Sequence, residues 1–104
     1  MKLLTADLEA MLQNATKPMV LDFYADWCVP CRMQGPQFQQ AEAQLTGKAE
    51  FFKVDIEAQP GLAARFEVMS IPTIVVTLGG KMRWRSVGVT SADEIVAAVT
   101  PLLR

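Results

Sequence analysis

Both cysteines of the chain lie in one short segment, Trp27-Cys28-Val29-Pro30-Cys31. The residues before it, 18–25, are mostly apolar or aromatic and predict a buried strand, although Asp22 interrupts them. Pro30 suits the first turn of a helix, where its missing N–H is not needed, and residues 32–44 carry apolar side chains at roughly helical spacing. The cysteine pair is therefore expected where a strand passes into the N-terminus of a helix.

This position favours ionisation of Cys28. The free N–H groups and the positive dipole end of a first helical turn stabilise an anion, so a thiol there loses its proton more easily than a free thiol. Cys31 lies about one turn further along the helix, close enough for a disulfide and further from water. The sequence thus predicts Cys28 as the attacking thiolate and Cys31 as the resolving thiol.

Three uses of this pair are compatible with the residues. A purely structural disulfide would close a loop of only four residues, which stabilises the fold by about 2 kcal/mol. A zinc site would need ligands from a second copy or from carboxylates, because the chain has no other cysteine and no histidine. Reversible dithiol–disulfide chemistry is the usual role of two cysteines at this spacing in a strand-to-helix turn, and it is the favoured interpretation.

The length of 104 residues, with 51% hydrophobic and 20% charged residues, predicts a single folded domain over residues 1–104. A net charge of -1 gives no general attraction to nucleic acid or to an anionic membrane. Asp7 and Glu9 interrupt the N-terminal apolar residues, so neither a signal peptide nor a membrane span is predicted. We expect a cytoplasmic protein without nucleic-acid or membrane partners.

The remaining elements follow from periodicity and turn residues, and they predict an α/β fold with a central mixed sheet of four or five strands and helices on both faces. Gly79-Gly80 predicts a tight antiparallel hairpin, Ser91 with Glu94 a helix-capping box, and Pro36 and Pro101 a kink and an early helix end. The expected strands cover residues 2–4, 18–25, 49–56, 73–78 and 81–87. The expected helices cover a segment from Thr5 to about Asn14, then residues 30–45, 62–66 and 92–102. The first of these helices carries an apolar stripe of Leu8, Met11, Leu12 and Ala15.

Charged residues within strands raise two further questions. Lys81, Arg83 and Arg85 alternate with less polar residues and predict one basic face, which is typical of a protected edge strand and, as a weaker alternative, of nucleic-acid binding. Lys53 stands alone in its strand, where the simplest interpretation is a buried stem with its ammonium in water.

A combination of motifs extends over nearly the whole chain. It comprises residues 20–31, Pro36, Lys53-Val54-Asp55, Pro60-Gly61, Ser70-Ile71-Pro72-Thr73, Gly79-Gly80 and Gly88. The most specific part is Trp-Cys-x-Pro-Cys followed about 40 residues later by Ile-Pro-Thr. In this combination the chain resembles the thioredoxin family.

The resemblance implies a thioredoxin fold and a protein-disulfide reductase without bound cofactor or metal, whose redox-active group is a Cys28–Cys31 disulfide. Cys28 would attack substrate disulfides, Cys31 would resolve the mixed disulfide, and a thioredoxin reductase would restore the dithiol. Protein disulfides are the implied substrates, and the chain is expected to act as a monomer. The buried acid of the family matches Asp22, and its lysine partner matches Lys53.

The resemblance also implies a docking surface. Pro72 matches the cis-proline loop that faces the active site, and the backbone of Ile71 would pair with an extended substrate segment. The implied substrate-binding residues are Trp27, Val29, Pro30, Ile71, Pro72, Gly88 and Val89.

Resolution by Cys31 requires a proton acceptor, and the chain has no histidine. A desolvated carboxyl at Asp22 would have a raised pKa suited to this task, moderated by the ammonium of Lys53. A buried acid retained only for fold specificity is the alternative interpretation of Asp22.

Two departures from the family pattern qualify these expectations. Val29 replaces the commoner glycine and stiffens the turn, with an effect on reduction potential or partner choice whose direction the residues do not fix. The N-terminal segment is shorter than usual, so the first strand is expected to be vestigial or missing.

A disulfide oxidase or isomerase, and a non-redox interaction module, are the alternative functions.

Overall fold

Strand β2 (Met19–Tyr24) is the middle strand of a five-stranded mixed sheet in the order β1-β3-β2-β4-β5. The computed structural model describes residues 2–3 and 8–103 of the chain. In it β2 pairs in parallel with β3 (Glu50–Asp55) and antiparallel with β4 (Thr73–Leu78). The strand that leads to the cysteines is therefore flanked by strands on both sides, and every β2 residue except Tyr24 is buried.

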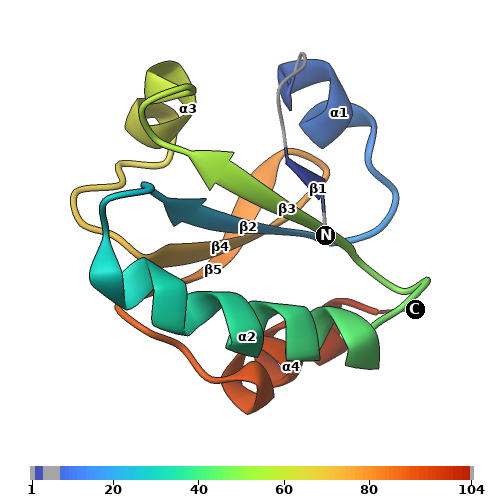
Figure 1. Ribbon diagram of the computed structural model, residues 1–104. Coiled ribbons are helices and arrows are strands. Elements are labelled where there is room, and N and C mark those ends of the chain that lie inside the picture. The colour runs from blue at the N-terminus through green and yellow to red at the C-terminus, as the bar shows by residue number, and fades with distance from the viewer. Residues whose placement is uncertain (1, 4–7, 104) are drawn as a thin grey trace.

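Helices cover both faces of this sheet (Figure 1), which confirms the predicted fold class. Helices α2 (Val29–Gln44) and α4 (Ala92–Val99) cover one face, and α1 (Leu8–Asn14) and α3 (Pro60–Arg65) cover the other. A short 3-10 helix, η1 (Thr100–Leu102), follows α4. None of the helices in the described part of the chain is both long and apolar enough to cross a membrane.

Alternation along β2 builds one core on each side of the sheet. Leu21 and Phe23 pack with α1 and α3 on one side, where the rings of Phe23 and Phe66 lie 6.1 Å apart. Val20 packs with Phe38 of α2 on the other side. Asp22 and Tyr24 follow Val20 at intervals of two residues, so they point toward the face that α2 covers.

The N-terminal elements agree only in part with the sequence prediction. Strand β1 (Lys2–Leu3) is short but present, and it pairs in parallel with β3. Helix α1 ends at Asn14 as predicted, and Leu12 is fully buried. Met11 is 37% exposed, so its predicted place in the buried stripe is wrong. A short helix on a sheet buries a narrow stripe, and Met11 is turned about 100° away from Leu12. The predicted cap at Thr5 lies outside the described residues.

Strand β5 (Lys81–Val87) contains an irregularity that the sequence did not reveal. Val76 pairs with Trp84, but Thr77 pairs with Met82, so Arg83 is an extra residue in this strand. The predicted continuous basic face is therefore wrong, because a bulge interrupts the alternation of side chains. Arg85 instead donates to the backbone carbonyls of Phe66 at 2.8 Å and Glu67 at 3.2 Å, which ties β5 to the end of α3.

The hairpin between β4 and β5 and the two ends of α4 agree with the sequence prediction. The hairpin glycines Gly79 and Gly80 have φ angles of 61° and 85°, which a side chain would disfavour. Ser91 and Glu94 form the predicted capping box at the start of α4, and the α-helix stops before Pro101. Helix α2 continues through Pro36, and a kink at that residue stays a prediction.

Candidate active site

The cysteine pair lies at the N-terminus of α2, as the sequence predicts. Cys28 is the N-cap residue, and its Sγ accepts a hydrogen bond from the backbone N–H of Cys31 at 3.3 Å. The two residues form a disulfide across a Cα–Cα distance of 5.3 Å. Because a first-turn N–H already points at the Cys28 sulfur, the reduced protein would stabilise a thiolate there.

Both sulfur-bearing residues are buried in the disulfide form. Cys28 is 5% exposed and Cys31 is 7% exposed, so the predicted difference in their access to water is wrong for this state. The reason is the loop before β4, since the carbonyl oxygen of Ile71 lies 3.9 Å from Cys28 Sγ. Tyr24 and Ile56 also pack against the cysteines.

The predicted docking residues fall into three segments around the disulfide. Trp27 and Val29 flank Cys28 in the chain and are 64% and 63% exposed. The Ile71–Pro72 peptide bond is cis, with Ile71 half-buried against the cysteines and Pro72 buried. These two segments place exposed apolar side chains and a backbone carbonyl next to the Cys28 sulfur.

The third segment is the loop after β5. The N–H of Gly88 donates to the carbonyl oxygen of Pro72 at 2.8 Å, which holds this loop against the cis-proline segment. Val89 follows and is 46% exposed. Pro30 is exposed in the first turn of α2. Ile71, Pro72 and Gly88, which lie far from the cysteines in sequence, are thus linked to the cysteines by contacts that the structure records.

Sequence reasoning missed three residues near this site. Met33, one turn after Val29 in α2, is 64% exposed, and Met69, just before the cis-proline segment, is 91% exposed. The spacing of Val29 and Met33 was a usable signal, since residues four apart share a helix face. The third residue is Gln34, which is fully buried although glutamine is mostly a surface residue. No pattern in the sequence marks it.

Asp22 is buried in the central strand at 1% exposure, and neither carboxyl oxygen has a hydrogen-bond partner in the described structure. Its neighbour two residues along the same strand face, Tyr24, packs against the cysteines. Burial raises the pKa of the Asp22 carboxyl to about 7, and the positive charge of Lys53 acts in the opposite direction. The carboxyl therefore titrates near neutral pH.

Lys53 is the cross-strand neighbour of Asp22 in β3. Its side chain is half-buried, and Nζ lies 4.2 Å from the centre of the Tyr24 ring, within the range of a cation–π contact. The structure therefore relates Lys53 to Asp22 by charge and by strand register, and it gives the ammonium a direct contact with Tyr24. The strand register places the Lys53 side chain on the face of the sheet where Asp22 lies.

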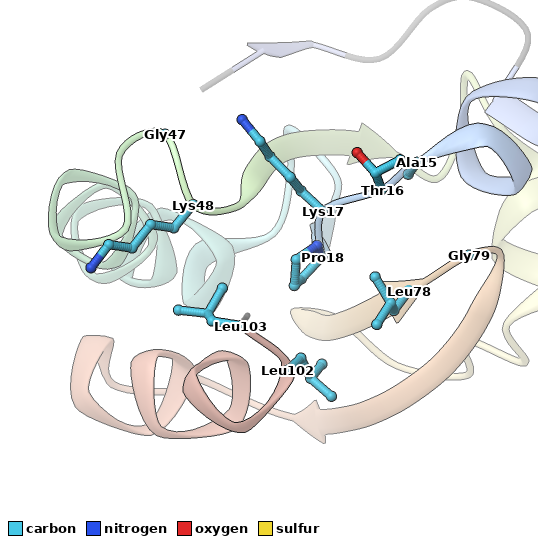
Figure 2. A pocket seen from close by; sticks show the side chains of 10 residues that line it. All are labelled: Ala15, Thr16, Lys17, Pro18, Gly47, Lys48, Leu78, Gly79, Leu102 and Leu103. Atoms are coloured by element: carbon cyan, nitrogen blue, oxygen red, sulfur yellow. The ribbon is translucent and has the colours of Figure 1, made fainter.

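The candidate site combines the buried cysteines with exposed apolar side chains such as Trp27 and Val29. A cavity of about 650 Å³ occurs elsewhere, and its lining includes Lys17, Pro18, Gly47, Leu78 and Leu103 (Figure 2). Neither cysteine is among its ten lining residues. Within residues 2–3 and 8–103, no cluster of three or more His, Cys, Asp or Glu side chains is arranged to hold a metal ion.

Comparison with known proteins decides the family. A thioredoxin family model matches residues 1–101. The chain is 37% identical over 81 residues to thioredoxin 1 of Chlorobaculum tepidum, covering 78% of this chain and 80% of that protein. The chain belongs to the thioredoxin family. It is also 36% identical to a thioredoxin of Staphylococcus aureus, covering 90% of this chain and 88% of that one.

Solved thioredoxin structures share the fold. The crystal structure of a Malassezia sympodialis thioredoxin superimposes with a TM-score of 0.85 at 28% identity, covering 96% of this chain and 90% of that one. Family membership together with the Cys28–Cys31 pair makes this chain a thiol–disulfide oxidoreductase with a redox-active disulfide. Of the three uses that the sequence left open, the reversible dithiol is the one that applies.

The burial of Asp22 predicts a specific dependence of stability on pH. Between the ordinary carboxyl pKa near 4 and the folded value of about 7, the folded protein holds a proton that the unfolded chain has lost. Stability should therefore fall as the pH rises through this interval. Asp22→Asn removes the ionisation and should raise the free energy of unfolding of the oxidised protein by about 4 kcal/mol at about pH 8, with little gain at about pH 4.

Denaturant unfolding at both pH values measures this effect. Asp26→Asn is the matched control, because Asp26 is exposed just beyond the same strand and its substitution should change stability by less than about 0.5 kcal/mol. Equal stabilities of wild type and Asp22→Asn at the higher pH would show that the carboxyl is not destabilised by burial.

Proposed function

We propose that this chain is a protein-disulfide reductase in which Cys28 attacks and Cys31 resolves. The observation that carries the proposal is the Cys31 N–H, 3.3 Å from the Cys28 sulfur at the N-terminus of α2. In the first step the Cys28 thiolate attacks one sulfur of a substrate disulfide, whose S–S bond breaks as the other sulfur leaves as a thiolate. The product is a mixed disulfide between Cys28 and the substrate.

In the second step Cys31 loses its proton and attacks the Cys28 sulfur. The mixed disulfide breaks, the substrate leaves as a second thiolate, and the Cys28–Cys31 disulfide forms. The dithiol has then given two electrons to the substrate, which is reduced. A reductant must return two electrons to the disulfide before the next cycle.

We assign the proton from Cys31 to Asp22, directly or through water. The Asp22 pKa of about 7 is closer to the pKa of a thiol than the pKa of an ordinary aspartate is. This smaller difference favours proton transfer from the thiol at neutral pH. Both carboxyl oxygens lack other hydrogen-bond partners in the described structure and are free to accept. Lys53, as the nearby positive charge, limits how far the pKa rises and keeps part of the Asp22 population ionised.

We propose that extended segments of protein substrates bind across the apolar surface around Cys28. The exposure of Trp27 and Val29 supports this role, as does the position of the Ile71 carbonyl beside the attacking sulfur. A backbone group beside a reactive sulfur offers the strand-like pairing by which extended peptides are commonly recognised. The proposed surface comprises Trp27, Val29, Pro30, Ile71, Pro72, Gly88 and Val89.

The proposal extends to partners and setting. Protein disulfides are the substrates, and a thioredoxin reductase is the electron donor. The protein acts in the cytoplasm as a monomer, and residues 1–104 form one domain. A net charge of -1 and the small number of cysteines support this assignment, since neither suggests a nucleic-acid partner or an oxidising compartment.

The reduction potential of the cysteine pair tests the reductase direction. Equilibration in dithiothreitol buffers should give a potential below about -240 mV, in the range of thioredoxins and not of disulfide oxidases. The same preparation should reduce insulin with dithiothreitol as the electron source. A potential above about -180 mV would indicate an oxidase or isomerase. Val29→Gly would then show whether the valine, which is 63% exposed beside Cys28, causes the change.

The role of Asp22 has a separate kinetic test. When reduced protein meets insulin, Asp22→Asn should lengthen the lifetime of the mixed disulfide about tenfold or more, because the proton acceptor for Cys31 is lost, while the rate of attack by Cys28 stays within about twofold. Acid quenching followed by mass spectrometry resolves the two steps. Asp26→Asn should behave as wild type, and Cys31→Ser should stop resolution. An unchanged lifetime in Asp22→Asn would exclude the assignment.

A further inference from the structure

The side-chain amide of Gln34 joins the cysteine-bearing helix to a distant loop. Its Nε2 donates to the carbonyl oxygen of Thr90 at 2.8 Å, and its Oε1 accepts from the N–H of Thr90, also at 2.8 Å. Gln34 lies three residues after Cys31 in α2, whereas Thr90 lies 56 residues away in the chain, between β5 and α4. Gln34 is fully buried and Thr90 is 1% exposed.

This pair of bonds satisfies both the N–H and the carbonyl group of the Thr90 backbone. A glutamine amide presents one donor side and one acceptor side, so it matches the N–H and the carbonyl of a single residue. Buried backbone groups need such partners, and an apolar side chain at position 34 would supply neither. Hydrogen bonds in a buried setting are also less weakened by competing water.

The loop that Gln34 holds is the third segment of the docking surface. The Gly88 N–H is bonded to Pro72, and the Thr90 hydroxyl donates to the Gly88 carbonyl at 3.0 Å. Val89 projects between these anchors with 46% of its surface exposed. Gln34 thus links the helix that starts at the cysteines directly to the Gly88–Thr90 loop.

We propose that Gln34 is a positioning residue that sets the distance between the cysteines and the Gly88–Thr90 loop, and thereby selects extended protein disulfides over small ones. The inference rests on the proposed reductase function. A protein segment that spans the docking surface touches both the first turn of α2 and the loop, so its binding depends on their separation. A small disulfide needs access to the Cys28 sulfur alone.

Gln34→Met tests this role, because methionine has a similar length but no amide. The matched control is Gln37→Met in the same helix, since Gln37 Oε1 accepts from the Ala92 N–H at 2.9 Å and has no contact with the loop among the recorded hydrogen bonds. Stopped-flow mixing of pre-reduced protein with increasing insulin gives a half-saturating concentration and a limiting rate. The rate with dithiobis(nitrobenzoate) reports on a small disulfide.

For insulin, the half-saturating concentration of Gln34→Met should increase about three- to tenfold with the limiting rate within about twofold. The rate of Gln34→Met with the small disulfide should change by a smaller factor than its half-saturating insulin concentration does. Gln37→Met should match wild type in both assays. An unchanged insulin half-saturation, or an equal loss with both disulfides, would overturn the inference. A wild-type protein that does not reduce insulin would overturn the proposed function and this inference together.

Hydrogen exchange of the wild type keeps the inference testable if Gln34→Met does not fold. The Thr90 amide, bonded to a buried side chain, should exchange as slowly as amides of the central strands such as Val75. Exchange at the rate of an exposed loop amide would show that Gln34 does not hold the loop, and it would contradict the positioning role.

Discussion

Burial of the Asp22 carboxyl in the central strand is the constraint on which the site depends. The strand is flanked on both sides, and the carboxyl has no hydrogen-bond partner in the described structure, so its charged form is destabilised at neutral pH. The same desolvation that lowers stability raises the pKa of this group to about 7. The proton acceptor that we propose for Cys31 therefore destabilises the fold when it is ionised.

The cysteines react from a frame that the rest of the chain holds in place. β2 delivers them to the N-terminus of α2, where a backbone N–H points at the Cys28 sulfur. The cis-proline segment contributes the Ile71 carbonyl, and Gly88 is bonded to that segment through Pro72. Gln34 satisfies the backbone of Thr90 between β5 and α4, and Arg85 donates to the Phe66 carbonyl at the end of α3. The surroundings of the two cysteine sulfurs thus depend on contacts between residues that are far apart in the sequence.

Local signals in the sequence were enough for the element order, the hairpin at Gly79-Gly80, the capping box at Ser91 and the placement of the cysteines, since each depends on neighbouring residues. The failures depend on partners distant in sequence. The bulge at Arg83 arises from pairing with β4, and burial of Gln34 requires Thr90. Likewise, Cys28 loses its predicted access to water because Ile71, far along the chain, packs over it.

The most direct test of this account is a titration of the Asp22 carboxyl by carbon NMR in the oxidised protein, with Asp22→Asn to assign the signal. Burial predicts an apparent pKa of about 7, far above that of an ordinary aspartate. A value of about 4 would show that the carboxyl is solvated or paired in solution. In that case the pKa of Asp22 would be too low for the carboxylate to accept the Cys31 proton readily. The proposed role of the buried acid in resolution would then be contradicted.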